Sequence, residues 1–208
     1  MFMIANSPHI MIQNFSQMPF VKVDPELQTV HCDNLFLTVD IFHYELDFHR
    51  LLMISDAVYK KIVLDVMLYD NRANTTHYFL SLKTVTSEVS SSSTMVNGTN
   101  FSSNTWSLCK PGGIKNVVHF KSSKEQFFTC YFTQEWLDEY LKNCEEETSK
   151  FFKEFMASDV AFMMLPRSFN KNAQDYNLFY DVFNQNVPVE KINHKEFECV
   201  TQEMLAKF

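Results

Sequence analysis

The histidines and cysteines could define an active site through their chemistry, but their spacing does not favour one. Seven His and five Cys are spread along the chain without a His-x-His or Cys-x-x-Cys pair, and no Gly-x-Ser-x-Gly motif is present. Metal centres in β-barrels use two or three converging His, and serine hydrolases use a nucleophile elbow. We therefore expect no metal, no cofactor and no catalytic residues, and the chain is not predicted to be an enzyme.

Polar and aromatic side chains in strand-like segments could instead line a ligand-binding cavity. Small-molecule sites in barrels are mainly apolar and aromatic, with a few polar groups that orient the ligand. Alternation along a strand places Trp106 and Leu108 on one face, and likewise groups Phe127, Thr129 and Tyr131. For each aromatic side chain, ordinary core packing is the competing interpretation. The candidate ligand-binding residues are His43, Arg50, Tyr78, Trp106, His119 and Tyr131.

Charge and cysteine usage restrict the class of protein. The net charge is -7 and no basic stripe is present, which argues against duplex DNA binding by these residues. The odd set of Cys without a Cys-x-x-Cys pair favours reduced thiols and a cytoplasmic protein. No secretory signal or membrane-spanning apolar run is expected. Four glycosylation sequons, at Asn14, Asn74, Asn97 and Asn100, are explained by the Asn-rich and Ser-rich composition.

The first two thirds of the chain read as a series of strands. Residues 1–26 contain three prolines and are predicted to form an extended arm. Residues 34–42 alternate with a period of two, residues 61–69 and 77–85 are expected to pair as an antiparallel hairpin, and residues 105–110 form a further strand. Asn97-Gly98 is typical of a tight reversal. Strands at this spacing, without intervening helices, indicate a small barrel or jelly roll.

The segment from Lys110 to Leu141 is the most informative part of the sequence. A Pro111-Gly112-Gly113 turn precedes two β-like runs, at residues 117–120 and 127–132. Thr133 then reads as the N-cap of an amphipathic helix that follows without a linker. The predicted order is therefore turn, strand, strand and helix.

This segment resembles the end of the cupin-like sensor domain of bacterial AraC-type transcription regulators. The resemblance implies an α+β fold in which a cupin-like (jelly-roll) β-barrel is followed by a C-terminal helical extension. It implies an arm and sensor barrel at residues 1–132 and a dimerisation and linker region at 133–208. The implied partners are a small-molecule effector and a second copy of the chain, with no membrane. The dimer seam would contain Trp136, Leu137, Tyr140 and Leu141, although this stripe could equally pack on its own barrel.

The last third of the sequence is predicted to be helical, with further helices at residues 174–184 and 194–207. The resemblance implies that DNA is bound only by a helix-turn-helix domain following Phe208. The expected function is therefore effector sensing and dimerisation in a transcription regulator. A free-standing cupin enzyme, or a carbohydrate-handling jelly-roll protein, is the alternative.

Overall fold

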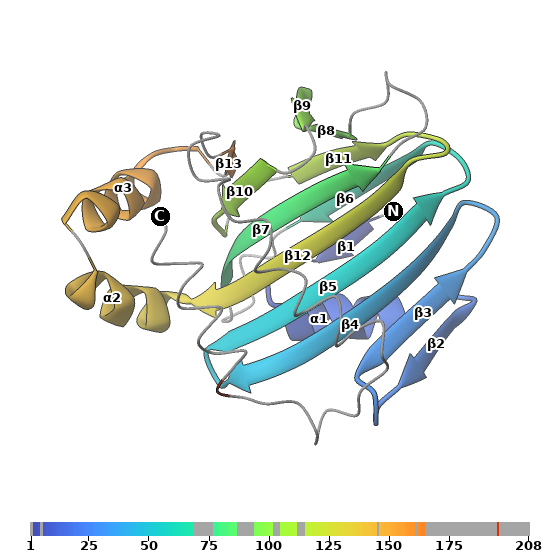
Figure 1. Cartoon of the computed structure of the whole chain (residues 1–208), viewed down its shortest axis with the longest axis horizontal. Helices are drawn as coiled ribbons and strands as arrows, with labels where there is room; N and C mark the ends of the chain where they lie inside the picture. The colour runs from blue at the N-terminus through green and yellow to red at the C-terminus, as the bar shows by residue number, and fades with distance from the viewer. Residues whose placement is uncertain are drawn as a thin grey trace.

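The fold combines two mostly antiparallel sheets with three helices in the part of the chain that the structure describes (Figure 1). The computed structural model describes residues 2–4, 6–68, 77–86, 94–101, 105–111, 115–144, 146–160, 162–164 and 195. These sheets and helices confirm the predicted α+β class. The described strands form two separate sheets rather than one closed barrel, so the cupin-like barrel stays a prediction.

The smaller sheet has five strands in the order β1-β6-β11-β8-β9. They are β1 (Phe2–Ile4), β6 (Val63–Leu68), β11 (Lys115–His119), β8 (Thr94–Val96) and β9 (Thr99–Phe101). Strands β1 and β6 are parallel, and the other neighbours are antiparallel. Asn97 and Gly98 both have positive φ between β8 and β9, which confirms the predicted tight reversal.

The larger sheet has eight antiparallel strands in the order β13-β10-β7-β12-β5-β4-β3-β2. Its first four strands are β13 (Phe162–Met164), β10 (Thr105–Cys109), β7 (His77–Thr86) and β12 (Lys124–Thr133). The other four are β5 (Arg50–Tyr59), β4 (Leu37–Asp47), β3 (Thr29–Asp33) and β2 (Val21–Asp24). Long strands at its centre give the sheet two broad faces.

The first helix, α1 (Pro8–Ser16), corrects the prediction of an extended arm. Ser7 caps it by accepting a hydrogen bond from the Ile10 amide at 3.2 Å. Proline is compatible with the first helical position, because the amide that it lacks would have no partner inside the helix. Met11 and Phe15 are buried against the larger sheet, so burial of this apolar face stabilises the helix.

Two further helices lie together at one end of the larger sheet (Figure 1). Helix α2 (Gln134–Asn143) follows β12 directly, and Thr133 caps it by accepting the Trp136 amide at 3.3 Å. Helix α3 (Glu146–Ala157) buries Phe152 and Phe155 in the same core as Leu137 of α2. This confirms the predicted strand, strand and helix order between β11 and α2.

The predicted hairpin between residues 61–69 and 77–85 is wrong. Strand β6 pairs with β1 and β11 in the smaller sheet, whereas β7 pairs with β10 and β12 in the larger one. The chain therefore crosses between sheets, because each strand finds its partners from distant parts of the sequence. The predicted helix at residues 174–184 and the glycines of the Pro-Gly turn lie outside the described residues, as does the predicted helix at 194–207 except for residue 195.

Candidate functional site

The larger sheet presents two faces with different coverings. One face packs against α2 and α3, and we call it the helix face. The other, the inter-sheet face, packs against α1 and the smaller sheet: Leu51 and Tyr131 contact the core around Met11, and Tyr59 lies in a core with Val63 of β6. The two faces are separate environments because successive side chains in a strand point to opposite sides.

The six predicted ligand-binding residues are divided between these environments. Arg50 and Tyr78 both lie opposite Phe132 in the strand register, which places them on the helix face. Trp106 is 3% exposed in the helix-face core. His43, Tyr131 and His119 belong to the inter-sheet side. A sheet separates the two groups of three, so the six residues do not line one common site.

A row of hydroxyl groups crosses the inter-sheet face at its centre. The register aligns Thr129 of β12 with Ser81 of β7, and Ser81 with Ser107 of β10. These three buried residues are the hydroxyl row. Thr129 Oγ1 lies 2.8 Å from Ser81 Oγ, and Ser107 Oγ donates to the Ser81 carbonyl at 3.4 Å. Burying a hydroxyl group costs free energy unless the group is hydrogen-bonded. Three hydroxyl residues in one row between the sheets are therefore unusual for a packed core.

His43 extends this polar row across the sheet. It lies opposite Met53, and Met53 lies opposite Thr129. Burial lowers the pKa of His43 below its ordinary value of 6.5; Glu45 opposes this effect and His9 adds to it. The imidazole is therefore neutral at pH 7 and offers one donor and one acceptor.

Apolar and aromatic side chains flank the hydroxyl row on both sides. On one side Leu51, Phe79 and Tyr131 are aligned in the register and are buried beneath Met11 of α1. On the other side Ile41, Ser55 and Phe127 are aligned and only partly buried, although they lie on long strands inside the sheet. Incomplete burial here means that solvent reaches the inter-sheet face beside the hydroxyl row.

His119 lies among protein partners of its own, and its role in ligand binding stays a prediction. Its Nδ1 lies 2.8 Å from Glu125 Oε2 and its Nε2 lies 3.3 Å from Asp65 Oδ2. Tyr59 stacks on the imidazole, with ring centroids 4.1 Å apart and planes 7° apart. Burial alone would lower the pKa of His119, but the hydrogen bonds to Asp65 and Glu125 outweigh it and raise that pKa above 6.5.

Arg50 and Tyr78 have partners that connect the sheet to α2. The Arg50 guanidinium forms two hydrogen bonds with Asp47 Oδ2 and lies 5.3 Å from the centroid of the Trp136 ring. The Tyr78 hydroxyl donates to Gln134 Oε1. Both side chains thus hold α2 on the sheet. These contacts within the protein account for the two polar groups, and no ligand is needed to explain them.

The predicted dimer seam on α2 is partly used within the chain. Leu137 and Leu141 are 1% and 6% exposed in the helix-face core. Packing on the protein's own sheet takes most of their apolar surface, and their place in a dimer seam stays a prediction. Trp136 and Tyr140 stack on each other at 5.1 Å and are partly exposed, so their part in a seam stays a prediction.

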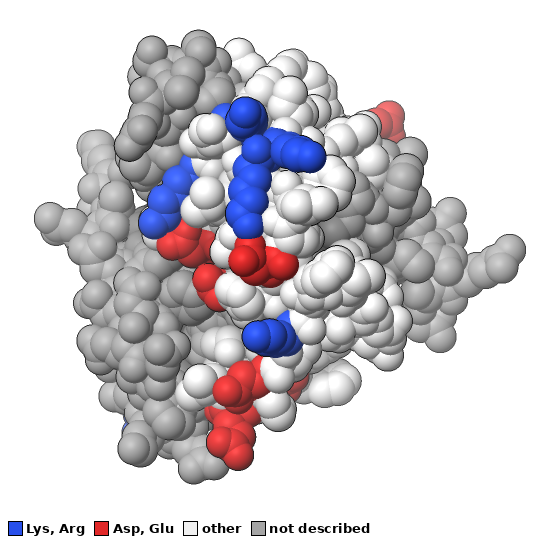
Figure 2. Space-filling model, turned by 90° about the vertical axis from the view of Figure 1, so that its right-hand side faces the viewer, with Lys and Arg blue, Asp and Glu red and all other residues white. Residues whose placement is uncertain are grey.

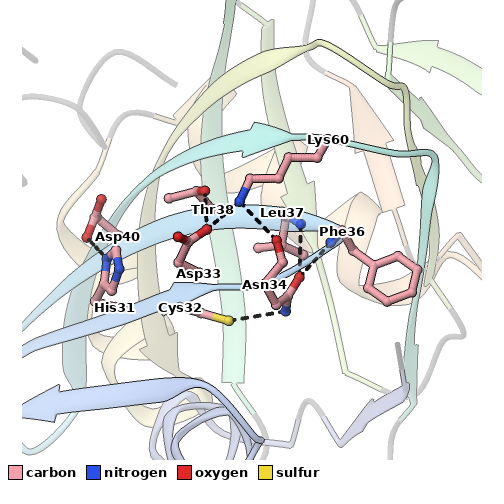
Figure 3. A network of polar contacts seen from close by, with 9 residues as sticks. All are labelled: His31, Cys32, Asp33, Asn34, Phe36, Leu37, Thr38, Asp40 and Lys60. Atoms are coloured by element: carbon pink, nitrogen blue, oxygen red, sulfur yellow. Dashed lines mark hydrogen bonds and ion pairs between the residues drawn. The ribbon is translucent and has the colours of Figure 1, made fainter.

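A network of polar contacts at the turn between β3 and β4 has a structural role (Figure 3). Asn34 Oδ1 accepts hydrogen bonds from the amides of Phe36 and Leu37. Lys60 Nζ bonds to Asp33 and to the Asn34 carbonyl, and these contacts tie this turn to the end of β5. The contacts are exposed and satisfy one another. The Asn34 turn also explains why the strand predicted from residue 34 begins at Leu37.

Charged groups of both signs share the end of the molecule that holds this turn. Figure 2 shows Lys and Arg gathered in the upper part of this face, with Asp and Glu beside and below them. Lys60 and Lys124 pair with Asp33 and Asp56 there. The described part of this face therefore has no uninterrupted basic surface of the kind that duplex DNA requires.

Sequence reasoning missed most of the polar residues between the sheets. Ser81 and Ser107 were not singled out, and neither were Tyr59, Asp65 and Glu125. A hydroxyl residue within an otherwise apolar alternation, as at Thr129, was the available signal. Among the described residues, no group of three or more His, Cys, Asp or Glu has an arrangement that could hold a metal ion. The four described cysteines, Cys32, Cys109, Cys130 and Cys144, are free thiols.

Comparisons with known proteins give matches among solved structures but none in sequence. No protein family matches the sequence, and no curated protein is similar to it. Among solved structures, the AraC-like transcriptional activator CuxR is similar, with a TM-score of 0.45 and 10% sequence identity. The match covers 82% of this chain and 54% of that chain, so the chain corresponds to about half the length of CuxR. No described helix is long and apolar enough to cross a membrane.

Proposed function

We propose that this chain is the effector-sensing domain of an AraC-type transcription regulator, and that it binds a small molecule without catalysing a reaction. The hydroxyl row is the observation that carries the proposal. Its three hydroxyls and the neutral His43 can orient a ligand by hydrogen bonds, while Tyr131 and Phe127 on either side supply apolar contact.

The sequence resemblance between Lys110 and Leu141 supports the regulator class. In this proposal DNA is bound by a helix-turn-helix domain following Phe208, and two sensor domains pair through the exposed parts of Trp136 and Tyr140. The cupin-like barrel belongs to the same proposal. Effector binding between the sheets would then act on α2, which follows β12, the strand that carries Thr129.

A thermal-shift screen of small metabolites, followed by calorimetry on each hit, tests the binding site. Thr129→Val removes a hydroxyl from the row and keeps the side-chain shape. We expect it to weaken the binding of a genuine effector by about 2- to 12-fold, which corresponds to one hydrogen bond of about 0.5–1.5 kcal/mol.

Thr38→Val is the matched control, because Thr38 bonds to Asp33 in the exposed network at the turn. The control should bind each hit as the wild type does. If a hit binds Thr129→Val and the wild type with equal affinity, its binding site does not include the hydroxyl row. Conversion of a hit into a product would contradict the proposal and favour an enzyme.

A test of the regulator assignment needs the full-length protein that the natural gene encodes. That gene product, expressed in full, should shift its own promoter DNA in a mobility assay, and a confirmed effector should change the midpoint of that shift. A full-length product that has no helix-turn-helix domain and does not bind DNA would overturn the assignment, whatever the outcome at Thr129.

A further inference from the structure

Among the residues that the structure describes, His119 is the one histidine that links the two sheets through buried carboxylates. It lies at the end of β11 in the smaller sheet, while Glu125 lies on β12 in the larger one. The side chains of His119 and Glu125 are 4% and 0% exposed. Ser123 Oγ donates to the other oxygen of Glu125 at 2.9 Å. The bond between His119 and Glu125 is therefore a direct polar link from sheet to sheet, shielded from water.

The surroundings of His119 favour its charged form. Among the described residues, the charged groups that face it are Asp65 of β6 and Glu125 of β12, and Tyr59 of β5 is the other titratable group. Burial, Asp65 and Glu125 raise the pKa of the Tyr59 hydroxyl well above 10, so this residue stays neutral. One imidazolium between two carboxylates can donate a hydrogen bond to each of them.

A neutral imidazole cannot serve both carboxylates, because it has a single N–H. When the proton leaves, either Asp65 or Glu125 faces a lone pair on a ring nitrogen. A buried carboxylate oxygen that faces a lone pair in place of the imidazole N–H is destabilised, even where the carboxylate keeps other partners, and separation of the sheets would let water solvate that oxygen.

We propose that His119, held between Asp65 and Glu125, is a protonation-dependent latch that fastens the smaller sheet to the larger one and releases as the pH rises. The direction of this pH effect follows from the coupling between proton binding and closure of the two sheets. A histidine with a raised pKa in the closed state adds stability that is complete below its ordinary value of 6.5 and is lost as the pH passes its closed-state pKa. The closed sandwich is thus favoured on the acidic side.

An NMR titration of the histidine ring signals in the wild-type protein is the first test. The His119 signal is identified by its absence from the spectrum of His119→Gln, or by its contacts with Tyr59 if that variant does not fold. We expect it to titrate above 6.5. A midpoint at or below that value would overturn the proposal.

Hydrogen exchange measured over the same pH range, corrected for the intrinsic pH dependence of exchange, tests the release itself. Protection of β6 and β11 should fall about tenfold for each pH unit between the ordinary and the closed-state pKa of His119. Protection of β4 should not follow this step. Unchanged protection of β11 throughout the titration of His119 would contradict the latch.

His31→Gln is the matched control, because His31 Nδ1 lies 2.6 Å from Asp40 Oδ1 in an exposed pair. That variant should retain the pH-dependent step in β6 and β11. A folded His119→Gln should lack it, since glutamine does not titrate. A step that survives in His119→Gln, or disappears in His31→Gln, would assign the pH dependence to another group.

Discussion

Arg50 Nη2 lies 2.6 Å from Asp47 Oδ2 on one side, while the Arg50 guanidinium lies beneath the Trp136 ring on the other. The arginine side chain is 6% exposed and the aspartate side chain 38% exposed. A buried cation thus has a carboxylate at the end of β4 on one side and an aromatic ring of α2 on the other. This arrangement anchors the helix at the point where it leaves β12.

Asp47→Asn should lower the free energy of unfolding at pH 7 by about 1–2 kcal/mol, because a buried guanidinium loses its charged partner while solvent screens part of the loss. Burial of Asp47 opposes ionisation, but the hydrogen bonds from Arg50 and a backbone amide outweigh it and lower its pKa below 3.8. The contribution is therefore present above pH 3.8 and disappears as the pH falls through the lowered pKa.

Urea unfolding at pH 7 and at decreasing pH measures this difference. Asp33→Asn is the control, because Asp33 pairs with Lys60 on the exposed surface and should have little effect. Equal losses in the two variants would show that the buried position of Arg50 adds nothing.

Thr133→Ala should weaken the start of α2. The Thr133 hydroxyl accepts the Trp136 amide and lies 3.0 Å from His49 Nδ1. Loss of an N-cap costs about 1 kcal/mol. Unfolding followed by circular dichroism should show this loss, and Thr133→Ser should restore most of the stability. Failure of serine to do so would mean that the methyl group, rather than the cap, is responsible.

Trp136 and Tyr140 should contribute to a symmetric dimer through the parts of their rings that the sheet leaves exposed. The double variant Trp136→Gln, Tyr140→Gln should dissociate the dimer in light scattering, since large aromatic residues at interfaces contribute about 2 kcal/mol or more each. Its circular dichroism should match that of the wild type.

Lys142→Gln, which changes an exposed residue on the same helix, should leave the dimer intact. A wild-type protein that is monomeric at high concentration would refute the dimer. Unfolding of the double variant would mean that these rings serve the core alone.

Residues 1–208 by themselves should not bind duplex DNA specifically, because their net charge is -7 and Lys and Arg must displace counterions from the phosphates. A mobility-shift assay with the promoter of the parent operon measures this at two salt concentrations. Tight binding that weakens with salt would place a DNA-binding surface in this part of the chain.

Local patterns in the sequence were enough to predict several elements. Alternation in residues 127–132 predicted β12 and the shared face of Phe127, Thr129 and Tyr131, and the Thr133 cap predicted the start of α2. Asn97-Gly98 predicted the β8–β9 reversal. These features depend on neighbouring residues, since backbone preferences and caps act within a few positions. The α1 helix was missed because prolines near its ends suggested extended chain.

The sequence alone could not show which faces these elements share. Period-two alternation separates the faces of one strand without saying what covers each, so Arg50 and His43 entered one predicted site although a sheet separates them. Asp65, His119 and Glu125 lie on three strands, and only the pairing of β6 with β11 and the packing of the two sheets bring them together. Long-range pairing placed the two carboxylates beside the buried imidazole. Burial alone would lower the pKa of His119, but the hydrogen bonds to these partners outweigh that effect and raise it.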